Sequence, residues 1–225
     1  MAPHVRAGYS VHMTGFAAQE RQALAELLAT VGPDAPTLCT GWRTSDLVAH
    51  LVLRESRPDA AVGILAKPLA GWTKKVQDST KGHTPYPELV DRFRAGPPTW
   101  SPTRFGAVNE AANTLEFFIH QEDVRRAAPN WTPRDLPADL DDEIWRRLRA
   151  SVKLLFRKAQ VGVTLVRAPQ QQTVVAKPAT PLMVTVTGTA GELAMFCHGR
   201  KDAAQVELHG DAPAIERLRL TPLGL

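Results

Sequence analysis

Apolar side chains in the first 158 residues recur with the period of an α-helix, and proline or glycine follows several of these repeats. This pattern predicts helices at Phe16–Val31, Thr44–Arg57, Pro87–Arg94, Val108–Ala128 and Asp139–Lys158. A less regular apolar segment runs from Val62 to Trp72 between the second and third helices. We therefore expect residues 14–158 to form a helical bundle. Residues 1–13 lack an apolar core and are expected to be a disordered tail, with Met13 as an alternative start.

The apolar period changes near residue 160 to the alternation of β-strands. Strands are predicted at Val161–Val166, Thr173–Ala176, Met183–Thr187 and Gln205–His209. Thr189 is expected to cap a helix that reaches about His198, and a last short helix follows the final strand. The chain should thus be mostly α, with a small α/β domain over residues 161–225.

Composition narrows the class of protein. The 225 residues are 44% hydrophobic and 22% charged, which is ordinary for a globular protein. The net charge of +4 is dispersed and lacks an interleaved basic and aromatic platform, so nucleic acid is not expected as a partner. No apolar run approaches the roughly 18 residues of a membrane span. The two cysteines imply no disulfide framework, so a reducing cytoplasm is the expected location.

The most informative pair of residues is Glu116 and His120. They are one helical turn apart, so both lie on one stripe of the predicted helix, flanked by Ala112 and Ile119. A buried ionised carboxylate is unfavourable unless it is paired or binds a cation. Glutamate and histidine are both ligands of divalent metals such as zinc. The pair therefore reads as two ligands of a metal site.

His50 is the candidate third ligand. It shares an apolar face with Leu47 and Leu51 on a helix that Thr44 or Ser45 caps. Taken alone, a histidine beside leucines is more often a satisfied core residue. Together with Glu116 and His120, it completes a three-ligand set that leaves one coordination position open, as in catalytic zinc sites.

These residues carry a resemblance to a known group of proteins. His50 and the Glu116-x-x-x-His120 motif resemble the DinB-like and mycothiol-dependent maleylpyruvate isomerase superfamily. Further similar segments are Leu38–Trp42, Val184–Leu193 and His198-Gly199-Arg200, and an actinobacterial subgroup of metal-binding proteins shares the phrases at Arg57–Ala61 and Glu116–Phe118. The resemblance implies a DinB-like bundle, a sterol-carrier-like C-terminal domain, and a divalent ion, expected to be zinc, held by His50, Glu116 and His120.

The same resemblance implies a function. The metal would activate a low-molecular-weight thiol, mycothiol, which attacks a small-molecule electrophile in an S-transfer or a cis–trans isomerisation. Two other functions stay open on the sequence: a non-catalytic metal-binding protein, and a module that binds a small molecule between the domains.

Three further side chains, Arg54, Arg200 and Asp123, have alternative interpretations, and a fourth, Cys39, has one expected role. Arg54 and Arg200 are candidate anchors for an anionic substrate; alternatively, Arg54 pairs with a nearby carboxylate and Arg200 ends a helix. Asp123 is expected to orient a metal-binding imidazole, although a fourth-ligand role or a surface pair with Arg125 or Arg126 is open. Cys39 is expected to be a small buried side chain without a nearby base.

Overall fold

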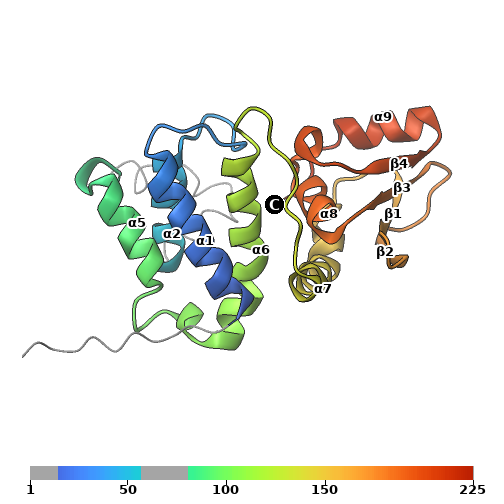
Figure 1. Ribbon diagram of the computed structural model, residues 1–225. Helices are drawn as coiled ribbons and strands as arrows, with labels where there is room; N and C mark the ends of the chain where they lie inside the picture. Colours follow the sequence, from blue (N-terminus) through green and yellow to red (C-terminus); the bar gives the residue numbers. More distant parts are fainter. Residues whose placement is uncertain (1–14, 57–80, 225) are drawn as a thin grey trace, which may run out of the picture.

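The computed structural model describes residues 15–56 and 81–224, which form a helical part and an α/β part side by side (Figure 1). The described helices of the first part are α1 (Phe16–Val31), α2 (Thr44–Ser56), α5 (Tyr86–Ala95) and α6 (Gly106–Arg125), with a 3₁₀ turn, η2 (Pro102–Arg104). The expected tail at residues 1–13 and the segment from Val62 to Trp72 lie outside the described residues.

The helical part is held together by one apolar core. Leu24 and Leu28 of α1 meet Leu51 of α2, Phe93 of α5 and Phe117 of α6, and all five are at most 1% exposed. Gly32 ends α1 with a φ of +79°, a conformation that glycine adopts without strain. The helix limits agree with the predicted ones to within a few residues, because the apolar period and the glycine and proline residues that follow several helices both indicate them.

The α/β part contains a four-stranded mixed sheet in the order β2-β1-β3-β4. Its strands are β1 (Gly162–Arg167), β2 (Gln172–Lys177), β3 (Met183–Gly188) and β4 (Glu207–Gly210), and its helices after β3 are α8 (Ala190–Cys197), η3 (Lys201–Ala203) and α9 (Ala212–Leu220). β1 pairs antiparallel with β2 and parallel with β3, which pairs antiparallel with β4. Thr189 caps α8 by accepting a hydrogen bond from the backbone N–H of Glu192, as predicted.

Helix α7 (Ala138–Leu155) packs mainly on α8, and also on α6 and β2. Its buried residues Ile144 and Leu148 share a core with Leu165 and Val186 of the sheet. The sequence grouped this helix with the bundle because an amphipathic period shows that a helix has an apolar face but not which neighbour covers that face. The overall class, mostly α with a small α/β part, is confirmed; the division into independent domains at residue 160 stays a prediction.

A buried ion-pair network joins α6 to α8. Arg126, directly after α6, has its Nε 2.6 Å from Glu122 Oε2 and its two terminal nitrogens 2.9 and 2.6 Å from the carboxylate of Glu192. The same guanidinium donates to the carbonyl of Ala203 in η3 at 2.6 Å.

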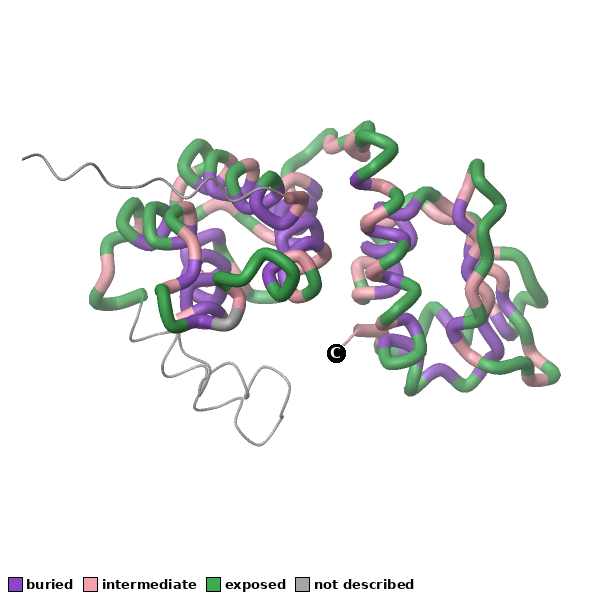
Figure 2. Tube along the Cα trace, turned by 90° about the horizontal axis from the view of Figure 1, so that it is seen from below, coloured by how far each residue is buried: buried purple, intermediate pink, exposed green. Residues whose placement is uncertain are grey.

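Buried positions lie on the inward faces of both parts (Figure 2). In the described ranges, every helix is too short or too polar to cross a membrane.

Candidate metal centre

The three sequence-predicted ligands converge. His50 on α2 and Glu116 and His120 on α6 each offer a ligand atom within 4.8 Å of the others. Glu116 Oε1 lies 3.5 Å from His50 Nε2 and 3.3 Å from His120 Nε2. Both imidazoles are buried, whereas the Glu116 side chain remains 29% exposed. The centre therefore sits below the surface with its carboxylate open to solvent.

These separations fit a metal better than they fit hydrogen bonds. Ligand atoms placed about 2.0–2.2 Å from a tetrahedral ion are about 3.4 Å apart. A charge-assisted hydrogen bond would instead be about 2.7–2.9 Å long. The observed 3.3 and 3.5 Å match the first value, and both distances end on the same carboxylate oxygen. Two imidazole nitrogens and one carboxylate oxygen are also a donor set that suits zinc.

Asp123 orients one of the imidazoles. Its Oδ2 lies 3.0 Å from His120 Nδ1, which leaves Nε2 of the same ring toward Glu116. Asp123 is fully buried, so it is not the surface pair that the sequence left open. Although burial opposes ionisation, the hydrogen bonds from His120 and Arg200 hold the pKa of Asp123 below its usual value. A carboxylate behind a ligating imidazole fixes both the tautomer and the ring orientation.

Arg54 lies beside the carboxylate of the centre. Its Nε is 3.3 Å from Glu116 Oε1, and its terminal nitrogens donate to Asn113 Oδ1 and, at 2.9 Å, to the carbonyl of Ala112. Burial opposes ionisation of Glu116, but Arg54 and the two histidines lower its pKa well below the ordinary value. The ion pair with Glu116 is therefore present, and a role of Arg54 as a substrate anchor stays a prediction.

Arg200 reaches the centre from the α/β part. Its Nε and one terminal nitrogen lie 2.8 and 2.7 Å from the two oxygens of Asp123. The terminal nitrogen is also 3.4 Å from Cys39 Sγ, and the Cys39 thiol donates to Asp123 at 3.2 Å. The expectation that Cys39 has no base nearby is wrong, because the fold brings Asp123 and His120 to it. Separations of 84 and 77 residues along the chain hid this cluster from the sequence.

A pocket of about 530 Å³ opens next to this cluster. Cys39 and Arg200 line it, together with Leu38, Thr40, His198, Gly199, Lys201, Asp202, Ala203 and Leu223. The Nδ1 of His198 lies 2.8 Å from the carbonyl oxygen of Ala194. Burial is the main cause that lowers the pKa of His198 to about 4. A cation and a thiol thus face a space large enough for a small molecule.

Fold and site together define a class of protein: a helical bundle that carries a cluster of possible metal ligands and is joined to a small α/β part. The family model for the mycothiol maleylpyruvate isomerase N-terminal domain matches residues 17–211, and the chain belongs to this family. The superfamily suggested by the sequence is thereby confirmed.

Two solved structures are similar to this chain. The crystal structure of a mycothiol-dependent maleylpyruvate isomerase superposes with a TM-score of 0.52 at 17% identity, covering 88% of this chain and 91% of that one. A variant of such an isomerase, in which alanine replaces a histidine, matches at 18% identity with the same coverage and a TM-score of 0.43. The first likeness supports the fold alone. No curated protein matches the chain.

Proposed function

We propose that this protein is a mycothiol-using enzyme in which a divalent ion, zinc by its donor set, is held by His50, Glu116 and His120. The observation that carries the proposal is the convergence of these three ligand atoms within 4.8 Å, together with the distances of 3.5 and 3.3 Å from Glu116 Oε1 to the two imidazole nitrogens, which match a tetrahedral site. The family to which the chain belongs, named for a mycothiol isomerase domain, supports the choice of thiol. A cytoplasmic location and a sterol-carrier-like C-terminal domain belong to the same proposal.

When bound, the ion lowers the pKa of a coordinated thiol so that the thiol is deprotonated at neutral pH. The side chains of the protein then have separate tasks. Glu116 neutralises part of the charge of the ion, and Asp123 holds His120 in the orientation that ligation needs. Arg200, already paired with Asp123, lies at the neighbouring pocket, where it is placed to attract an anionic group of the thiol or of the electrophile.

The reaction is an attack of the thiol sulfur on a small electrophile. An S–C bond forms, and the thiol proton is released to solvent. In an S-transfer the new bond remains and a leaving group departs with the electron pair. In a cis–trans isomerisation, the electrophile carries a C=C bond conjugated to a carbonyl group, and the π electron pair of that bond moves toward the carbonyl oxygen as the S–C bond forms. After rotation about the resulting C–C single bond, the pair returns, the C=C bond re-forms and the sulfur is expelled. Arg54, 3.3 Å from Glu116, is the second candidate for holding a substrate carboxylate during either step.

The test is an assay with zinc-loaded protein, mycothiol and a panel of electrophiles that includes maleylpyruvate, in which both the consumption of thiol and the isomerisation of the electrophile are followed. We expect His120→Ala to lose both the metal and the activity. Arg200→Lys should keep the metal and raise KM for an anionic reactant, because lysine keeps the charge without the paired hydrogen bonds. Metal-loaded wild-type protein that neither consumes thiol nor isomerises any electrophile in the presence of mycothiol would contradict the proposal.

One observation favours a second candidate, a non-catalytic metal protein. Cys39, His120 and Asp123 form a second group of possible ligands, whose ligand atoms also lie within 4.8 Å of one another. An ion that took Cys39 or Asp123 as a fourth protein ligand would have no open position for a thiol, as in structural zinc sites. Activity with mycothiol decides between the two candidates, since a closed coordination sphere would leave the protein metal-loaded and inactive.

A further inference from the structure

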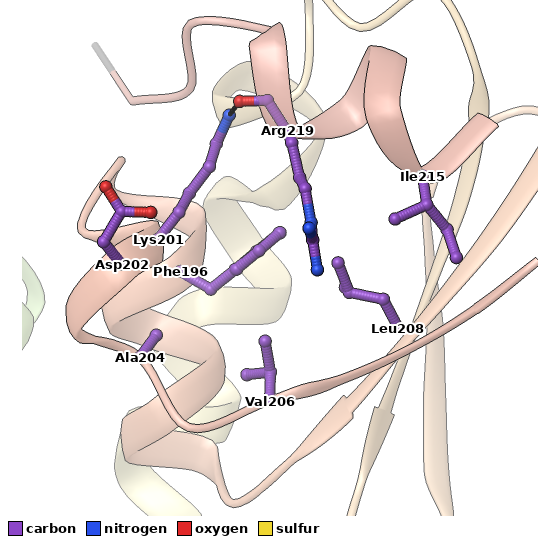
Figure 3. Close-up of a pocket in the computed structure, with 8 residues that line it drawn as sticks. All are labelled: Phe196, Lys201, Asp202, Ala204, Val206, Leu208, Ile215 and Arg219. Atoms are coloured by element: carbon purple, nitrogen blue, oxygen red, sulfur yellow. Dashed lines mark hydrogen bonds between the residues drawn. The ribbon is translucent and has the colours of Figure 1, made fainter. Parts of the chain in front are cut away.

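A second pocket lies in the α/β part, and it shares Lys201 and Asp202 of η3 with the pocket beside Cys39. Its volume is about 420 Å³, and its lining comes from α8, η3, the start of β4 and α9 (Figure 3). The eight lining residues are Phe196, Lys201, Asp202, Ala204, Val206, Leu208, Ile215 and Arg219. None of the proposed metal ligands is among them, so the pocket is separate from the centre described above.

One wall of this pocket is apolar. Phe196 is 2% exposed and forms the deep end, while Val206, Leu208 and Ile215 are only partly buried and border the open space. Figure 3 shows Ile215 entering from α9, opposite Val206 and Leu208. Covering apolar surface that borders water contributes roughly 25 cal/mol per Å² to the binding free energy of a ligand. The wall therefore favours a compact apolar group.

One cation is available to the same space. Arg219 extends into the pocket, with its guanidinium close to Phe196 and Leu208 (Figure 3). Within residues 15–56 and 81–224, this guanidinium makes no hydrogen bond or ion pair. The other cation, Lys201, is engaged: its Nζ donates to the carbonyls of Leu218 at 2.9 Å and Arg219 at 2.8 Å, and also to that of Thr221.

The remaining charge limits the ligand to a single negative charge. Asp202 is exposed at the rim, on the far side of Lys201 from Arg219 (Figure 3). With one free guanidinium and one carboxylate nearby, a dianion such as a phosphate monoester would lack the cations that it needs. The volume lies near the lower end of the range of about 300–1,000 Å³ for small-molecule sites, so a long acyl chain does not fit.

We propose that this pocket binds a small organic carboxylate. Arg219 holds the carboxylate through its paired N–H groups, and a compact aryl or branched aliphatic body lies against Phe196, Val206, Leu208 and Ile215. The ligand is not a reactant of the thiol chemistry at the centre, because this pocket is lined neither by the proposed metal ligands nor by Cys39 and Arg200; it shares only Lys201 and Asp202 with the pocket beside Cys39.

The probe is phenylacetate, a single ring with one carboxylate, titrated into the full-length zinc-loaded protein and followed by amide NMR shifts. We expect saturable shifts at residues of α9 and β4. Phenylacetamide, which has the same shape without the charge, should bind about tenfold more weakly, as for loss of a hydrogen bond to a charged group. Arg219→Gln should weaken phenylacetate by a similar factor.

Arg217→Gln is the matched control, because Arg217, like Arg219, is exposed on α9 but does not line the pocket. The affinity of this variant for phenylacetate should equal that of the wild type. Ile215→Trp, which fills the apolar wall, should abolish the shifts while circular dichroism remains native. Three results would each overturn the proposal: no saturable shifts on α9 and β4, equal affinity for acid and amide, or binding that Arg200→Gln removes and Arg219→Gln leaves intact.

Discussion

Replacing Arg126 by methionine removes a buried cation that joins α6 to α8. Its guanidinium donates hydrogen bonds to Glu122, one helical turn earlier in α6, to Glu192 on α8 and to the carbonyl of Ala203. All these bonds are 2.6–2.9 Å long. Arg126 is 4% exposed, and the two carboxylates are 0% and 5% exposed. Methionine keeps much of the aliphatic volume, so the substitution tests the charge and its hydrogen bonds.

The expected loss can be worked out from the partners that remain. Breaking a buried ion pair by removing one partner costs about 3–5 kcal/mol, because a carboxylate is left buried without its cation. Glu122 keeps Arg125 at 2.8 Å and Arg134 at 2.9 Å. Glu192 keeps the backbone N–H of Gln205 at 2.6 Å. We therefore expect the lower end of the range, about 3 kcal/mol of unfolding free energy, or a fall in Tm of about 6–12 °C.

The assay is urea denaturation followed by circular dichroism. Arg92→Met is the control, since the Arg92–Glu88 pair is about half exposed and such pairs contribute at most about 1 kcal/mol. Glu192→Gln, alone and combined with Arg126→Met, completes a double-mutant cycle, for which we expect a coupling energy of about 2 kcal/mol. A loss below 1 kcal/mol for Arg126→Met, or no coupling, would refute the view that this network joins α6 to α8.

Three other outcomes are expected. Because the pKa of His198 is lowered to about 4 in the folded state, the unfolded state takes up a proton more readily as the pH falls. The free energy of unfolding should therefore fall by about 2 kcal/mol between pH 7 and 5 in the wild type, and by less in His198→Gln. If the free energies of unfolding of the two proteins depend on pH in parallel, this expectation is wrong. Gly210→Ala should lower Tm, whereas Gly106→Ala should not, since a Cβ at residue 210, where φ is +156°, would lie 2.4 Å from the Met183 carbonyl. Asp123→Asn should weaken zinc binding about 10- to 100-fold by releasing the imidazole that it orients, and unchanged affinity in a chelator competition would count against that role.

The sequence predicted the elements well because local chemistry specifies them. The limits of α1 follow from its apolar period and from Gly32, and Thr189 marks the start of α8 by its side-chain cap. The partner of α7 was not predictable in the same way. Its apolar stripe would fit either the bundle or the sheet, and the contact with α8 depends on the long-range path of the chain.

The same distinction between local and long-range information applies to the candidate site. Glu116 and His120 were visible because a helix places residues four apart on one stripe, and His50 stood out as a histidine on an apolar face. The cluster of Cys39, Asp123 and Arg200 has no such signal, since its members come from three distant segments. Only the fold shows that Arg200 is already paired with a buried carboxylate.

The central claim is that His50, Glu116 and His120 hold one metal ion. The most direct measurement is the zinc content of reconstituted wild-type protein and of two variants that separate the overlapping ligand groups, Glu116→Ala and Cys39→Ser. One zinc per chain in the wild type and in Cys39→Ser, with loss of zinc from a folded Glu116→Ala, is the predicted result. Zinc retained by Glu116→Ala and lost from Cys39→Ser would instead place the ion between Cys39, His120 and Asp123 and contradict the account.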